Sequence, residues 1–291
     1  MNNILYKNFI RYDCMNRLNL LKRFLTLFKS RDKKPDLDEY YDLYAKRKGK
    51  EAYTVLLDIL EKYPKFRNIG VLYLERADLE LLVNKDAHKA LEFLHKAYES
   101  GFSNNLMDQY YCCYGDALCR IGERKKGIEY LEKSVELNPT RSNLKNFGIW
   151  LSFFNDRRAI FIWKKVLEED PNNYQALIYL AREDFKASNK GKAILSLKRI
   201  EELNPSNREF YDIGRLYYEM EEYQLALNAY LQADRLGRLP KGSTYAAIAT
   251  CYAMLGEDNL AKKYLQWAEQ FNPENDYVQQ IAKEFKEAHL T

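Results

Sequence analysis

The sequence predicts an all-α protein, a right-handed superhelical solenoid of repeated helix-turn-helix units. The first of three supporting observations is a series of helix-ending prolines at Pro139, Pro171, Pro205 and Pro273, spaced by 32, 34 and 68 residues. Two series of small residues repeat with nearly the same period. They are Ala52, Ala90, Gly127, Ala159, Ala193, Ala226 and Ala261, and Gly115, Gly148, Ala181, Gly214 and Ala249. A fixed period of this length is typical of stacked structural repeats.

Each repeat has the pattern of two antiparallel helices. In the last one, Tyr245, Ile248 and Tyr252 lie three and four residues apart and share one helical face. A second helix carries Ala261 and ends before Pro273, because proline cannot continue a helix. Two helices approach closely only where a bulky side chain is absent, so Gly and Ala are expected at the crossing points.

This pattern resembles the tetratricopeptide repeat, a family of helix-turn-helix solenoids. Eight marker positions of the family are matched in the last unit by Tyr245, Ile248, Ala249, Tyr252, Ala261, Leu265, Ala268 and Pro273. The resemblance predicts seven repeats within residues 35–275, at about 33–66, 71–104, 108–140, 141–173, 174–206, 207–241 and 242–275, followed by a capping helix in 276–291. Four places depart from the pattern: Asp78 replaces a small residue, Asp184 a large one, Arg238 a proline, and the first helix around Tyr40 matches poorly.

Composition excludes several classes of protein. With 46% hydrophobic and 30% charged residues, the chain of 291 residues has enough apolar material for a core and is unlike a disordered chain. The net charge of +4 disfavours a nucleic-acid binder. The chain has five cysteines, and an odd count does not indicate a disulfide framework. This predicts a reducing compartment and therefore a cytoplasmic protein. In one alternative, the protein is peripheral to a membrane.

No pattern indicates catalysis, a metal or a cofactor. The three histidines, His88, His95 and His289, have no further ligands at metal spacing, and no phosphate-binding loop or nucleophile motif occurs. Cys112, Cys113 and Cys119 lie on one predicted helix without a Cys-x-x-Cys spacing, which favours packing over redox or metal chemistry. The protein is therefore predicted to be a non-enzyme that needs no cofactor.

The resemblance implies that the first helices of the repeats line a concave groove. In repeats four to six this surface is rich in cations and tyrosines, which suit an extended, acidic segment of another protein. The candidate binding residues are Lys145, Asn146, Tyr179, Arg182, Lys186, Arg208, Tyr211, Arg215 and Tyr218. The carboxylate clamp of some family members is not matched, because Ile149, Tyr179 and Asp212 occupy three of its five places.

Residues 1–34 form a basic head that differs from the rest of the chain. Nine Lys and Arg residues stand there against two Asp, a charge of +7, whereas the remainder carries −3. Between Arg17 and Lys29 the apolar residues gather on one half of a helical wheel. Three interpretations stay open: a cap docked on the first repeat, a loosely ordered segment, or a tether of residues 15–34 on an anionic membrane surface, which would make the protein a membrane-peripheral assembly factor.

Overall fold

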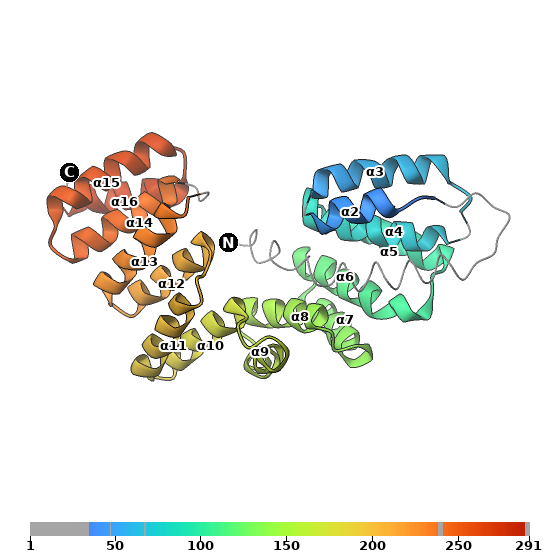
Figure 1. Ribbon diagram of the computed structural model, residues 1–291, viewed down its shortest axis with the longest axis horizontal. Coiled ribbons are helices and arrows are strands. Elements are labelled where there is room, and N and C mark those ends of the chain that lie inside the picture. Colours follow the sequence, from blue (N-terminus) through green and yellow to red (C-terminus); the bar gives the residue numbers. More distant parts are fainter. Residues whose placement is uncertain (1–34, 47, 67, 238–240, 289–291) are drawn as a thin grey trace. The chain divides into compact units, whose positions relative to one another are not determined.

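The computed structural model describes residues 35–46, 48–66, 68–237 and 241–288, and every regular element among them is helical (Figure 1). The predicted all-α fold is confirmed. The predictions for residues 1–34, Arg238 and His289 fall outside the described residues.

The chain divides into two compact units, residues 1–169 and 170–291. The described part of the first unit consists of four consecutive helix pairs. They are α2 (Asp38–Ala45) with α3 (Gly49–Lys62), α4 (Ile69–Leu79) with α5 (Ala87–Ser100), α6 (Met107–Arg120) with α7 (Arg124–Leu137), and α8 (Arg141–Phe153) with α9 (Arg158–Glu169). A π-helical turn, η1 (Glu80–Asn84), follows α4, and a 3-10 turn, η2 (Asn104–Leu106), precedes α6.

The described part of the second unit consists of three pairs and a single last helix. The pairs are α10 (Tyr174–Lys186) with α11 (Lys190–Glu202), α12 (Asn207–Glu219) with α13 (Tyr223–Arg235), and α14 (Lys241–Met254) with α15 (Asp258–Phe271). The last helix, α16 (Asp276–Glu287), packs on α14 and α15 with Val278, Ile281, Ala282 and Phe285 buried.

Several first helices begin at a side chain that caps the helix. Thr140, Asn173 and Asn275 each accept a hydrogen bond from the backbone N–H three residues on, which satisfies one of the unpaired donors at a helix start. Ser206 and Glu209 form a capping box at the start of α12. These caps define where the helices that carry the candidate site begin.

The small residues lie where the helices of a pair cross, as predicted. Ala193, Ala226, Ala249 and Ala261 have no exposed surface, and Ala181 is 1% exposed. At Gly115 a Cβ would lie 2.7 Å from the carbonyl oxygen of Gly127 and 2.9 Å from the backbone nitrogen of Leu131. Here α6 and α7 touch backbone to backbone, so the residue type is fixed by contact rather than by helix propensity.

A further periodic feature lies in the turns between paired helices. Lys85, Gly122, Asn155, Ser188, Glu221 and Gly256 all adopt positive φ. Their spacings of 37, 33, 33, 33 and 35 residues follow the repeat. Only two of the six are glycine, and left-handed conformations are uncommon for other residues. The series cannot be recognised in the sequence, although a positive-φ residue lies in the turn of each of the six pairs from α4–α5 to α14–α15.

Two departures from the repeat pattern are explained by polar contacts. The carboxylate of Asp78 accepts hydrogen bonds from the Tyr44 hydroxyl and, at 3.7 Å, from the Cys113 thiol. It thereby links α4 to α2 and α6, the first helices of the neighbouring pairs. Asp184 accepts from Lys192 Nζ at 2.8 Å, so an ion pair replaces the large side chain expected there.

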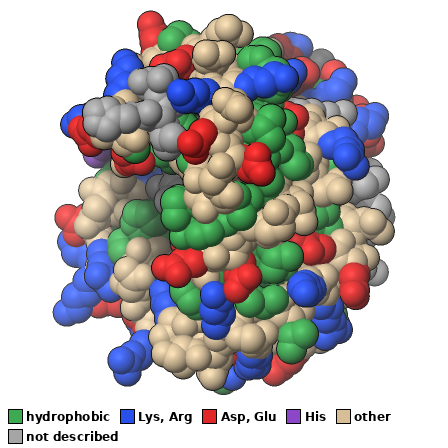
Figure 2. All heavy atoms as spheres, turned by 90° about the vertical axis from the view of Figure 1, so that its left-hand side faces the viewer, with side chains coloured by type: hydrophobic (Ala, Val, Ile, Leu, Met, Phe, Trp, Pro, Cys, Tyr) green, Lys and Arg blue, Asp and Glu red, His purple; other side chains and the backbone are tan. Residues whose placement is uncertain are grey.

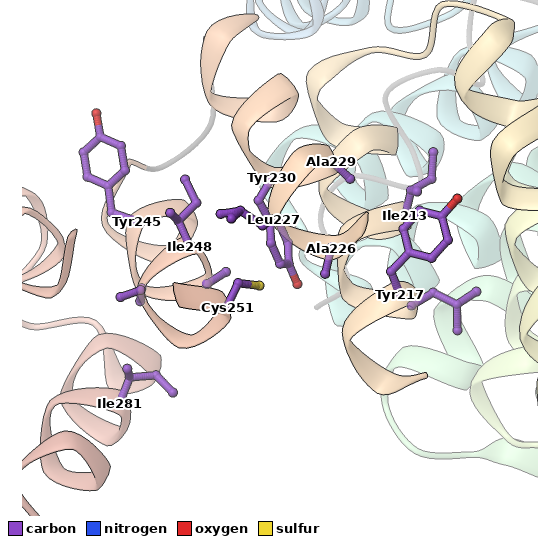
Figure 3. Close-up of a cluster of buried hydrophobic side chains, with 14 of the residues drawn as sticks. Ile213, Tyr217, Ala226, Leu227, Ala229, Tyr230, Tyr245, Ile248, Cys251 and Ile281 are labelled. Atoms are coloured by element: carbon purple, nitrogen blue, oxygen red, sulfur yellow. The ribbon is translucent and has the colours of Figure 1, made fainter. Parts of the chain in front are cut away.

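The second unit has a continuous apolar core that positions the candidate site. Ile213 and Tyr217 of α12, Ala226 and Tyr230 of α13 and Ile248 of α14 lie within it (Figure 3). All five are at most 4% exposed. Because α12 buries one face here, its opposite face, with the candidate residues, is held in a fixed orientation.

Candidate functional site

The structure divides the nine candidate residues between the two units. Lys145 and Asn146 belong to α8 in the first unit, and both are only 6% exposed. The Asn146 amide donates a hydrogen bond to Cys112 Sγ at 3.2 Å. The other seven candidates belong to α10 and α12 in the second unit.

In the second unit, three arginines and two carboxylates form an alternating chain of charges. We call the surface formed by Arg182, Arg208, Asp212, Arg215 and Glu219 the arginine face. The nitrogen–oxygen distances along it are 3.6 Å for Arg208–Asp212, 3.7 Å for Arg215–Asp212, 3.9 Å for Arg215–Glu219 and 3.4 Å for Arg182–Glu219. The last pair joins α10 to α12, so the side chains of two neighbouring repeats meet at this face.

The guanidinium groups of this face have unused donor capacity. Among the described residues, Arg182 Nε, Arg182 Nη2 and Arg215 Nε are buried and find no hydrogen-bond acceptor. Buried polar atoms are nearly always hydrogen-bonded, since an unpaired donor loses its water without compensation. Three such atoms on two adjacent arginines mark a place where an acceptor would be stabilised.

The two carboxylates of the arginine face differ in environment. Burial raises the pKa of the Asp212 carboxyl, and the guanidinium groups of Arg208, Arg215 and Arg182 oppose that shift. The Glu219 side chain is 42% exposed and stands at the C-terminal end of α12. Asp212 is thus a fixed part of the surface, whereas Glu219 has access to solvent.

Tyrosine hydroxyls border the arginine face on the side toward α14 and α16. Tyr211 packs against Tyr230 with ring centroids 5.2 Å apart, and Tyr218 against Tyr223 at 5.4 Å. The Thr250 hydroxyl is a hydrogen-bond partner of both Tyr218 and Tyr277. Burial raises the pKa of all three phenols, Tyr211, Tyr218 and Tyr277, so they remain protonated hydrogen-bonding groups at neutral pH.

Sequence reasoning missed Thr250 and Tyr277. Thr250 lies among small residues of the last repeat and Tyr277 lies in the predicted capping helix, so neither stands out in the sequence as a groove residue. A signal was available for Tyr277, because continuing the repeat numbering past Pro273 puts it at the second position of a further first helix, a position expected to face the groove.

The remaining two candidates contribute less to this cluster. Tyr179 lies half-buried on α10. Lys186 is exposed at the end of the same helix and is paired with Glu183 at 2.7 Å. The cluster is therefore centred on Arg182 and Arg215.

Charges of both signs are interspersed over the molecular surface in Figure 2, with a band of hydrophobic side chains between them. That face shows no extended basic field of the kind that binds nucleic-acid backbones. Within the described residues no three His, Cys, Asp or Glu side chains gather as metal ligands. None of the described helices combines the length and apolar character required to cross a bilayer.

Comparison with known proteins identifies the fold. A tetratricopeptide repeat-containing protein of Methanocaldococcus jannaschii is 27% identical over 161 residues, which are 51% of this chain and 28% of that protein. A tetratricopeptide repeat protein from Parabacteroides merdae superposes with a TM-score of 0.61 at 16% identity, covering 85% of this chain and 96% of the other. The chain has the tetratricopeptide-repeat fold.

Two other solved structures are similar in fold. The APC/C hetero-tetramer Cut9–Hcn1 gives a TM-score of 0.68 at 17% identity over 95% of this chain and 53% of the matched one. Yeast Tom70 gives 0.62 at 15% identity over 90% and 59%. No family model matches the chain. The chain spans less than a third of the length of its Methanocaldococcus jannaschii relative.

The thiols of Cys119 and Cys251 are expected to be unreactive in the folded protein. Burial raises the pKa of Cys119 and of Cys251 to about 12. Because the thiolate is the nucleophile, iodoacetamide at pH 8 should label both residues at least tenfold more slowly in native protein than in urea-unfolded protein. Peptide mapping by mass spectrometry measures this. Equal native and unfolded rates would contradict the packing role of these cysteines.

Proposed function

We propose that the protein is a non-catalytic interaction scaffold that binds an extended, acidic segment of another protein on the arginine face. The observation that carries the proposal is the set of buried guanidinium nitrogens on Arg182 and Arg215 that have no acceptor within the described part of the chain. A carboxylate of the bound segment supplies that acceptor in the bidentate geometry that arginine favours.

The arrangement favours an extended segment rather than a single small ligand. Arg182 on α10 and Arg215 on α12 come from consecutive repeats, and Tyr211 and Tyr218 each lie about one turn from Arg215 along α12, on either side of it. An extended chain presents side chains to one side every second residue, so it reaches several of these groups in turn. Tyrosine and arginine are also the residue types enriched at protein interfaces.

Replacing both central arginines by glutamate is expected to abolish binding of an acidic probe. The probe is a fluorescein-labelled decapeptide of alternating Glu and Ser with an amidated C-terminus, and binding is measured by fluorescence anisotropy at 50 mM salt. Arg182→Glu with Arg215→Glu should raise Kd at least twentyfold, because two attractive charges become repulsive, while circular dichroism keeps its helical signal.

The matched control carries the same charge change on the other helix of the pair. Lys198 and Arg199 are exposed on α11, and Lys198→Glu with Arg199→Glu should change Kd by less than threefold. Equal loss of binding in both double variants would mean that net charge, rather than the arginine face, controls capture. Unchanged binding in the Arg182 and Arg215 variant would remove the assignment altogether.

The alternative of a membrane-peripheral assembly factor rests on residues 15–34, which lie outside the described residues. Flotation with anionic liposomes, with and without those residues, tests it directly.

A further inference from the structure

We infer that Glu219 is an internal occupant of the arginine face, and that a carboxylate of the bound segment takes its place. This inference rests on the proposed function and makes Glu219 the residue that sets the specificity of the same site. It follows from how the carboxylate is held, from its exposure and from the neighbouring ion pairs.

The Glu219 carboxylate lies between the two central arginines without satisfying them. It is 3.4 Å from Arg182 Nε and 3.9 Å from Arg215 Nε. Among the described residues neither nitrogen donates a hydrogen bond, although both are buried. Glu219 thus supplies charge at the position where an acceptor belongs, but it does not supply the hydrogen bonds.

Three ion pairs elsewhere in the second unit are closer. Lys186–Glu183, Lys192–Asp184 and Lys190–Glu222 have nitrogen–oxygen distances of 2.7, 2.8 and 2.9 Å. The looser contacts of Glu219 follow from its position as the last residue of α12, one turn beyond Arg215, from which its side chain reaches sideways to α10. A partly exposed, poorly aligned ion pair contributes little to stability, so its displacement is easy.

Asp212 has the opposite role on the same face. It is more buried than Glu219 and stands between Arg208 and Arg215 on its own helix. With Asp212 in place and Glu219 turned to solvent, three arginines face one carboxylate. The vacated position then carries a net positive charge that only an anionic group neutralises.

The consequence is selection against uncharged segments. A polar but neutral peptide that displaces Glu219 leaves Arg182 and Arg215 without a counter-charge, which is unfavourable for partly buried groups. An acidic peptide restores the charge and adds the missing hydrogen bonds. Glu219 therefore disfavours uncharged segments by competing with them for the arginines, and its removal strengthens binding of acidic ones.

The test compares Glu219→Gln with wild type, using the alternating Glu–Ser decapeptide and a matching Gln–Ser decapeptide. Glu219→Gln should lower Kd for the acidic peptide threefold to tenfold at 50 mM salt, and the gain should shrink at 500 mM salt. The Gln–Ser peptide should stay unbound by wild type and become detectable with the variant. Thermal unfolding should be nearly unchanged, because Glu219 is weakly held.

The control is Glu222→Gln, which removes the same charge three residues on, where the partner is Lys190 of α11. It should leave Kd within a factor of two. If wild type and Glu219→Gln bind the acidic peptide equally, or the variant binds it more weakly, the role of Glu219 is wrong and the proposed function stands. If neither binds the acidic peptide at all, the proposed function fails and the inference falls with it.

Discussion

Replacing Gly115 by valine is expected to destabilise the first unit by roughly 3 kcal/mol, enough to separate α6 from α7. A Cβ at this position would meet the Gly127 carbonyl oxygen and the Leu131 side chain, both at 2.7 Å. Backbone atoms of the opposite helix cannot rotate away as a side chain does, so the helices must move apart. The loss is measured as a lower urea midpoint of the helical circular dichroism signal.

Gly191 provides the matched control. It lies in the first turn of α11, and a Cβ there would meet no heavy atom within 4 Å. Gly191→Ala should leave the midpoint unchanged or raise it slightly, because alanine favours the helix. A midpoint for Gly115→Val equal to that of wild type would show that the crossing tolerates separation, and the close-contact explanation of the repeated small residues would be wrong.

The fold could be predicted because the same requirement, a small residue at a helix crossing, recurs in every repeat unit that matches the pattern. Each small residue of the two series corresponds to a helix crossing. Because the match recurs at a fixed period, it is not a chance resemblance. The series of positive-φ turn residues could not be predicted from the sequence, since Lys85, Ser188 and Glu221 are not residue types that favour a left-handed backbone conformation. Their conformation is imposed by the short connection between packed helices.

The candidate site was predictable in part. The repeat numbering brought Arg182 of one repeat and Arg215 of the next to one surface, and the structure links them through Glu219. The numbering could not show that Lys145 and Asn146 are buried on α8, since burial depends on what packs over a position. Nor could it show that donor atoms stay unpaired, because this depends on distances of a few tenths of an ångström.

The first two repeats match the family pattern poorly because polar contacts replace part of their apolar packing. Glu80 is fully buried and accepts hydrogen bonds from Arg76 Nε at 2.8 Å, from the Tyr53 hydroxyl at 2.9 Å and from Asn84 Nδ2 at 2.6 Å. The Arg76 guanidinium lies 4.1 Å from the Tyr53 ring centroid and 4.8 Å from that of Phe93. This network bridges α3, α4, η1 and α5.

Replacing Glu80 by leucine is therefore expected to destabilise the first unit by about 3–5 kcal/mol. The substitution removes the common acceptor and leaves the Arg76 charge buried between two aromatic rings without a counter-charge. The urea midpoint of the variant measures the loss, and Glu51→Leu, at an exposed position on α3, serves as the control.

The double variant Arg76→Met with Glu80→Leu separates the two explanations of that loss. If the damage comes from the uncompensated charge, removing both charges restores a large part of the stability, because apolar side chains of similar volume replace a buried ion pair without desolvation. If the damage comes from lost shape, the double variant is at least as unstable as the single one. We expect the double variant to recover more than half of the stability lost in Glu80→Leu. Tyr53 and Phe93 present apolar ring faces that pack well against a methionine, whereas a lone guanidinium gains only their weaker cation–π attraction.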